Sequence, residues 1–176
     1  MNHTDNAIDS IERIEALIGR ELPADYRSWL TAPESDNPVP AQTVVPTDPP
    51  HKESVTSIYS TEDLLQEVEM AVDMNAAGSP DYPPGMIPIG ENGMGDCVLL
   101  SLRELDYGVV YFLFHEESNP DDNLWGLYAL GPTFADWLRS LVRGEVVQPT
   151  NEVAPIHQAN PTMTVSTPTK PWWRFW

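Results

Sequence analysis

The pattern of apolar and polar residues predicts two short amphipathic helices near the N-terminus. In residues 6–19, apolar side chains recur at intervals of three and four residues, which places them on one helical face. They are Ile8, Ile11, Ile14, Leu17 and Ile18. Gly19 suits the position just past the end of this helix. A second helix starts at Leu22-Pro23, because proline is tolerated in the first turn, and its apolar face is Tyr26, Trp29 and Leu30. We expect the two helices to pack as a hairpin.

The next part of the chain alternates between irregular and regular patterns. Residues 33–50 contain six prolines and little periodicity, which indicates a loop with room for a short edge strand at Val44-Val45. Residues 54–59 form a clearer strand. Ser60 then caps a third helix, with Asp63 as its capping-box partner. The apolar stripe of this helix is Leu64, Leu65, Val68 and Ala71 or Val72.

Residues 83–100 predict a β-hairpin at the centre of the domain. An apolar strand leads into Asn92-Gly93, which supplies the positive φ of a two-residue turn, and Gly95 adds a second permissive position. Residues 97–100 are apolar without a break, so both faces of this second strand are expected to be covered. The glycines do not form a phosphate-binding loop, because they lie in a hairpin and no lysine follows them.

Two further strands and one helix complete the predicted domain. Residues 109–114 are the most hydrophobic stretch and predict a central strand, and residues 124–130 predict another. Thr133 caps the last helix, whose core face is Phe134, Trp137, Leu138 and Leu141. The order of elements indicates one α+β domain over residues 4–144, with an antiparallel meander sheet packed with four helices. Residues 145–176 have the Pro- and Thr-rich composition of a flexible, disordered tail, which ends in a cluster of aromatic residues.

The net charge narrows the choice of partners. The chain has 27 acidic and 9 basic residues, a formal charge of -18, and 25 of the acidic residues precede residue 145. Such a surface repels nucleic acid and anionic membranes, and it attracts a basic protein. Solubility alone is the simpler explanation of the charge. The absence of a signal-peptide pattern, of a membrane-spanning apolar run and of a second cysteine beside Cys97 favours a cytoplasmic, reducing location.

The sequence offers few candidates for chemistry. Four acidic residues fall within seven positions: Glu116, Glu117, Asp121 and Asp122. This run favours a solvated loop most, a contact with a partner almost as much, and a cation site far less. His115 has no nucleophile to activate. Asp96 either faces a partner or accepts backbone N–H groups in its turn, and we favour the second role. We therefore expect a protein that is not an enzyme and has no cofactor or metal.

Four blocks of the sequence occur in an order that resembles a known family. The blocks are residues 11–30, with Leu22-Pro23 between two helices, residues 58–64, residues 87–96, with Pro88-Ile89-Gly90 and Gly95-Asp96, and residues 108–112 together with 133–138. Their order and spacing resemble the SUKH superfamily, which comprises bacterial immunity proteins related to the yeast Smi/Knr regulator. Residues 31–36 depart from the family's Asn-Gly-Gly pattern, Met94 replaces a common glycine, and the tail has no counterpart.

The resemblance implies a function. Many bacterial members of this superfamily bind a secreted or contact-delivered toxin, often a nuclease, and block it stoichiometrically. The alternative is a scaffold or regulatory module that docks through its tryptophan-rich tail. The predicted partner-binding residues, for a cognate toxin that is itself basic, are Glu91, Asp96, Glu116, Glu117, Asp121, Asp122, Trp172, Trp173 and Trp176.

Overall fold

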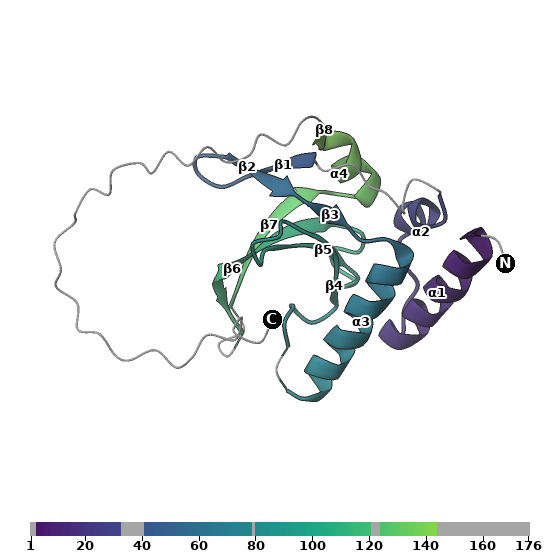
Figure 1. Cartoon of the computed structure of the whole chain (residues 1–176). Coiled ribbons are helices and arrows are strands. Elements are labelled where there is room, and N and C mark those ends of the chain that lie inside the picture. The colour runs from purple at the N-terminus through teal and green to yellow at the C-terminus, as the bar shows by residue number, and fades with distance from the viewer. Residues whose placement is uncertain (1–2, 33–40, 79, 121–123, 144–176) are drawn as a thin grey trace. The chain divides into compact units, whose positions relative to one another are not determined.

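The computed structural model describes residues 3–32, 41–78, 80–120 and 124–143, which form an α+β fold (Figure 1). The described elements are α1 (His3–Ile18), α2 (Ala24–Leu30), β1 (Ala41–Val45), β2 (His51–Val55), β3 (Ser57–Ile58), α3 (Thr61–Ala76), β4 (Met86–Glu91), β5 (Cys97–Ser101), β6 (Val110–Asn119), β7 (Leu124–Gly131), α4 (Phe134–Ser140) and β8 (Val142–Arg143). The α+β class predicted from the sequence is confirmed. No helix in the described part of the chain is both long enough and apolar enough to cross a membrane.

The strands form two antiparallel sheets. The larger sheet has the order β3-β4-β5-β6-β7, so consecutive strands are neighbours and form the expected meander. The smaller sheet has the order β2-β1-β8. The segment 54–59, predicted as one strand, is divided at Thr56 between β2 in one sheet and β3 in the other. A strand forms at Val44-Val45 as expected, but it belongs to β1, which is the central strand of the smaller sheet because β8 pairs with it at Ala41 and Gln42.

The helices pack in pairs that the sequence did not predict. The first helix ends as expected at Gly19, which has a φ of 67°, and the Arg20 N–H bonds to the Glu15 carbonyl at 3.2 Å. However, α1 lies along α3, and α2 packs on α4 (Figure 1). The α2–α4 contact is aromatic, with the Tyr26 and Phe134 rings 4.6 Å apart. The predicted α1–α2 hairpin is therefore not the main helix pairing.

Both faces of the larger sheet carry apolar side chains. Val98 and Leu100 of β5 belong to the main core, which also includes the helices. Leu99 belongs to a second cluster on the opposite face, with Met86 and Leu113. The unbroken apolar run in β5 therefore has both faces covered, as its sequence predicts.

The central hairpin has a longer turn than expected. Glu91 pairs with Cys97, so the loop spans residues 92–96 and is not a two-residue turn. Gly93 and Gly95 have positive φ angles of 73° and 102°. The Asn92 side chain explains the difference, because its Oδ1 accepts the N–H groups of Met94 at 2.8 Å and Asp96 at 3.1 Å. This Asx-type bonding stabilises a wider loop.

The predicted acidic loop after the central strand is partly a strand. β6 continues through Asn119, so Glu116 and Glu117 lie in β6 and face β7, and not in a loop. The longer strand is possible because β7 pairs with it again at Asn119, after a register shift. Asp121 and Asp122 lie outside the described residues. Residues 145–176 do so too, and the flexible tail expected there stays a prediction.

Candidate functional site

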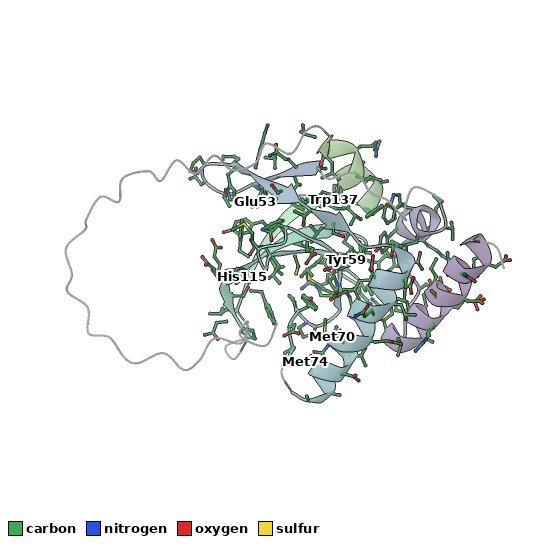
Figure 2. The ribbon with its side chains drawn as sticks, viewed as in Figure 1. Glu53, Tyr59, Met70, Met74, His115 and Trp137 are labelled. Carbon is green, nitrogen blue, oxygen red and sulfur yellow. The ribbon has the colours of Figure 1, made fainter. Side chains whose placement is uncertain are left out.

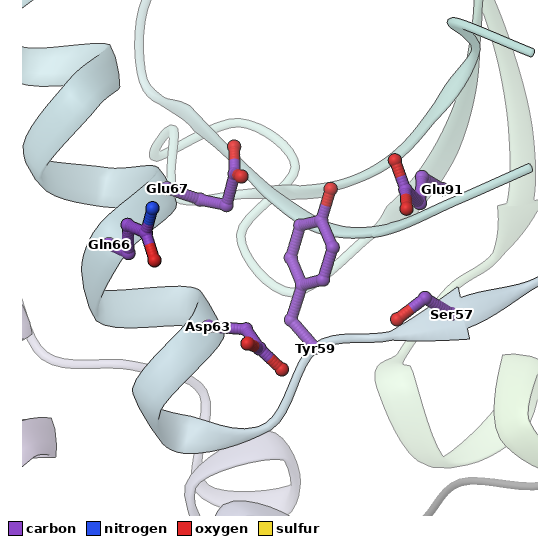
Figure 3. Close-up of a pocket in the computed structure, with 6 residues that line it drawn as sticks. All are labelled: Ser57, Tyr59, Asp63, Gln66, Glu67 and Glu91. Carbon is purple, nitrogen blue, oxygen red and sulfur yellow. The ribbon is translucent and has the colours of Figure 1, made fainter. Parts of the chain in front are cut away.

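A polar pocket of about 240 Å³ lies between the first turns of α3 and the edge of the larger sheet (Figure 3). Its lining residues are Ser57, Tyr59, Asp63, Gln66, Glu67 and Glu91. Asp63 and Glu67 come from α3 and form one wall, and Glu91 comes from the end of β4 and forms the other (Figure 3). The pocket therefore presents carboxylates from two sides.

The α3 wall follows from how this helix begins. The Ser60 side chain accepts the Asp63 N–H, and the Asp63 carboxylate accepts the Ser60 N–H, which completes the predicted capping box. Leu64 and Val68 are buried in the core. Asp63 and Glu67 are four residues apart, so they lie on one face of the helix, next to the core face that carries Leu64 and Val68. This face lines the pocket.

The opposite wall depends on a close approach of β3 to β4. Ser57 is paired with Glu91, and Ile58 with Gly90. A Cβ at Gly90 would lie 2.5 Å from the Ser57 carbonyl oxygen, so only glycine allows this spacing. Gly90 thus fixes the position of Glu91 at the pocket, which gives a structural reason for glycine at the end of the Pro88-Ile89-Gly90 block.

The carboxylates of the pocket have no cation of their own. Burial raises the pKa of Glu67, and the negative charges of Glu91, Asp63 and Asp81 raise it further. Neither the Glu67 carboxylate nor the Glu91 carboxylate forms a hydrogen bond or ion pair with another described residue, although the Glu91 backbone carbonyl accepts the N–H and the hydroxyl of Thr56. The arginines whose side chains the structure describes are paired with acidic side chains elsewhere: they are Arg13, Arg20, Arg27, Arg103 and Arg139. The pocket is consequently a centre of uncompensated negative charge.

Tyr59 places a hydroxyl group inside this field. Its side chain is only 7% exposed, and its hydroxyl lies between Glu67 and Glu91 (Figure 3). No hydrogen bond joins this hydroxyl to another residue in the described part of the chain. Burial raises the pKa of Tyr59, with further contributions from Cys97, Glu67 and Glu91, so the phenol stays neutral. It can therefore both donate and accept a hydrogen bond.

Of the residues predicted to bind a partner, the structure places Glu91 in the pocket and Asp96 in a different role. Asp96 is 8% exposed. Its Oδ1 accepts the His115 N–H at 3.1 Å and lies 2.7 Å from His115 Nδ1, while its Oδ2 accepts the Asn92 side-chain amide at 2.8 Å. Asp96 thus ties the hairpin loop to β6. Contrary to our expectation, Asp96 does not accept the backbone N–H groups of its own turn: Asn92 accepts those, and Asp96 accepts the N–H of His115 in β6.

The other predicted residues do not join the pocket. Glu116 and Glu117 are exposed on β6, two strands away from β4, and Glu117 accepts the Tyr128 hydroxyl at 2.8 Å. Figure 2 shows His115 on β6, well separated from Tyr59 beside α3. Asp121, Asp122, Trp172, Trp173 and Trp176 lie outside the described residues.

Sequence reasoning missed five residues of the pocket: Ser57, Tyr59, Asp63, Gln66 and Glu67. Asp63 was recognised only as a helix cap. The spacing of Asp63 and Glu67 in a helix directly after a strand was a usable signal, because it puts two carboxylates on one face. Their meeting with Glu91 depends on the pairing of β3 with β4, which brings together residues 34 positions apart and leaves no local signal.

The arrangement is suited to binding a positive charge. Burial raises the pKa of the Cys97 thiol to about 12, so this cysteine is a poor nucleophile. Among the residues that the structure describes, no group of three or more His, Cys, Asp or Glu side chains is arranged to hold a metal ion. The pocket is a carboxylate-lined depression that also contains the neutral hydroxyls of Tyr59 and Ser57.

These features define a small α+β domain with an acidic surface pocket. The chain belongs to the SMI1 / KNR4 family (SUKH-1), whose family profile matches residues 7–140. The match spans the four sequence blocks and confirms the resemblance on which the expected fold was based. Searches of curated proteins and of solved structures each found no significant match.

Proposed function

We propose that this protein is an immunity protein that binds a cognate bacterial toxin in the cytoplasm and blocks it stoichiometrically, without chemistry of its own. Its SMI1 / KNR4 (SUKH-1) membership supports this class of function. The observation that carries the proposal is the pair of carboxylates, Glu67 and Glu91, that lack a cation among the described residues of a chain with a charge of -18. Carboxylates left without a cation on a binding domain are suited to a basic partner.

The proposed toxin has a basic binding surface, as a nuclease does at the cleft that holds its substrate. An acidic protein can occupy such a cleft and exclude nucleic acid from it. Glu91 at the pocket, with Glu116 and Glu117 on β6, are the proposed contacts that the structure describes. Asp96 supports this surface by holding the hairpin loop. Asp121, Asp122, Trp172, Trp173 and Trp176 are proposed contacts outside the described residues.

The test is complex formation with the protein encoded beside this one. We expect a stoichiometric complex, protection of cells that express the neighbouring protein, and a dissociation constant that rises between 50 mM and 500 mM NaCl, since salt screens charge attraction. An equal dissociation constant at both salt concentrations would contradict the acidic-surface part of the proposal. Absence of both complex and protection would contradict the immunity function.

A truncated chain ending at residue 144 separates this function from the scaffold alternative. An immunity domain that meets its toxin mainly through the folded part should keep most of its affinity after truncation, with only the contribution of Trp172, Trp173 and Trp176 lost. Loss of binding in the truncated chain, with an unchanged circular dichroism spectrum, would instead favour docking through the tryptophan-rich tail.

A further inference from the structure

We infer that the pocket between α3 and β4 binds an arginine side chain of the protein partner. The existence of that partner rests on the proposed function, whereas recognition of arginine by the pocket can be measured without it.

The positions of the acceptors favour a guanidinium group. Glu67 stands on one wall and Glu91 on the other, with the Tyr59 hydroxyl between them (Figure 3). Gln66 and Ser57 add an amide oxygen and a hydroxyl to the lining. A guanidinium is planar and has five N–H donors in a fixed fork, so one group can bond to acceptors on both walls at once. Hydrogen bonds between a guanidinium and carboxylates are among the stronger ones in proteins.

The position of the Tyr59 hydroxyl supports a ligand in the pocket independently of the negative charge. Its side chain is more than nine-tenths buried, yet its hydroxyl faces the pocket without a hydrogen-bond partner among the described residues. The hydroxyl itself is open to the pocket, unlike that of Tyr26, which is fully buried without a partner in the described part of the chain, so a ligand in the pocket can reach it. The hydroxyl can accept a guanidinium N–H while the two carboxylates accept others.

Other cations fit the pocket less well. The described part of the chain has no cluster of ligands arranged for a metal ion. A lysine ammonium is a compact charge with three donors, so it approaches one wall and leaves acceptors on the other without a bond. The paired arginines of this chain bind carboxylates outside the pocket: Arg13, for example, binds Glu69, and Arg27 binds Glu15. The pocket is therefore open to an external group.

The first experiment titrates the isotope-labelled full-length protein with Nα-acetyl-L-arginine amide and follows backbone amide resonances by NMR. We expect saturable shifts centred on Tyr59, Glu67 and Glu91. The citrulline analogue has the same shape without the charge and should produce no saturable shifts, and the lysine analogue should bind more weakly. Absence of saturable shifts with the arginine probe, or equal shifts with the citrulline analogue, would overturn the inference.

Matched variants locate the binding. Glu67→Gln/Glu91→Gln should weaken binding of the arginine probe at least fivefold. Tyr59→Phe should weaken it about threefold, because it removes one hydrogen bond to a hydroxyl that water can also reach. Asp9→Asn/Glu12→Gln makes the same change in charge at two exposed positions of α1 and should leave binding unchanged. Equal losses in the two double variants would show that overall acidity, not the pocket, attracts the probe. Each variant is compared only if its amide spectrum away from the substituted residues matches that of the wild type, and single Glu67→Gln serves if the double variant does not fold.

The affinity of the wild type and of the double variant for the toxin distinguishes failure of this inference from failure of the proposed function. We expect Glu67→Gln/Glu91→Gln to raise the dissociation constant of that complex about tenfold or more, a range found for charge pairs that are desolvated in interfaces. If the wild type binds the toxin and the double variant binds it equally well, the arginine pocket is contradicted and the immunity function stands. If the wild type does not bind the toxin, the immunity function fails, and the NMR titration alone decides whether the pocket takes arginine.

Discussion

The indole Nε1–H of Trp137 donates a hydrogen bond to the Thr43 hydroxyl at 3.2 Å, and both side chains are almost completely buried. The bond joins α4 to β1, the central strand of the smaller sheet. Shortly after Trp137 the chain enters β8, which pairs with the same strand. Trp137 therefore holds the last helix against the small sheet at the point where that sheet is completed.

Replacement of Trp137 by phenylalanine should lower the free energy of unfolding by about 2–3 kcal/mol, because it removes both the hydrogen bond and part of a buried side chain. Thr43→Val removes the acceptor and keeps the volume, and should cost about 1 kcal/mol. Urea denaturation of the two single variants and the double variant completes a double-mutant cycle. The double variant should lose less than the sum of the two single losses, because the bond is lost only once. Strict additivity would show that the bond contributes nothing to stability.

The sequence predicted the elements of this fold better than their partners. Periods of two and three to four residues identified the helices and most strands, since these patterns reflect burial along one element. The smaller sheet was missed because β1 has only five residues in a proline-rich stretch and β8 has only two. Their pairing is fixed by contacts such as Thr43 with Trp137, 94 positions apart in the chain, and local periodicity carries no information on such contacts.

A second prediction concerns the close approach at Gly90. Gly90→Ala places a methyl group 2.5 Å from the Ser57 carbonyl oxygen, so β3 must move away from β4. We expect a loss of about 3 kcal/mol in the free energy of unfolding, the upper range for overpacking. Gly78→Ala is the control. Its φ of +78° would be strained for alanine, but no atom lies within 4 Å of the added Cβ. It should cost about 1–2 kcal/mol. Equal losses measured by urea denaturation would contradict the steric argument.

A third prediction concerns Asp106, which joins the loop after β5 to β6. Its carboxylate pairs with Arg103 and accepts the hydroxyls of Ser101 at 2.6 Å and Tyr111 at 2.8 Å. Hydrogen bonds from Arg103 above all, and from Ser101 and Tyr111, hold the pKa of Asp106 well below its usual value. Since this pKa is lower in the folded state than in the unfolded chain, the ionised carboxylate stabilises the fold.

That stabilisation is complete above the unfolded-state pKa of about 3.9 and is lost as the pH falls toward the folded-state pKa. Asp106→Asn should therefore cost about 2 kcal/mol at pH 7, and the difference from the wild type should narrow at pH 3. Glu104→Gln is the control, because Glu104 is highly exposed and 3.8 Å from Arg20, and it should change stability by less than about 0.5 kcal/mol. A loss for Asp106→Asn that is the same at both pH values would show that the charge is not responsible.

The candidate site was only partly predictable, for a reason that Glu67 illustrates. The acidic residues were identified by counting charge along the chain, and this favoured the dense run from Glu116 to Asp122. The structure instead concentrates uncompensated charge where single acidic residues from α3 and β4 converge. Which carboxylates lack a cation depends on where the arginines lie in the fold. Arg13 of α1, for example, pairs with Glu69, two residues after Glu67 in α3.

The last prediction follows from this lack of compensation: Glu67 should lower the stability of the free protein. Its pKa is raised by burial and by Glu91, Asp63 and Asp81, so its ionisation opposes folding. The sign is opposite to that of Asp106. The unfavourable effect is absent below the unfolded-state pKa of about 4.3, and it grows as the pH rises through the folded-state pKa. Glu67→Gln should therefore raise the free energy of unfolding at pH 7, by about 0.5–1 kcal/mol, and leave it unchanged at pH 4.

Urea denaturation at the two pH values measures this effect, with Glu116→Gln on β6 as a control of equal charge that should stay within about 0.5 kcal/mol of the wild type. A carboxylate that lowers stability in the free protein and strengthens binding is typical of a functional site, since the unfavourable charge is relieved only when a cation arrives. Glu67→Gln should thus stabilise the free protein while it weakens binding of the arginine probe. If Glu67→Gln changed neither quantity, Glu67 would be one more solvated surface charge, and the pocket would have no electrostatic role.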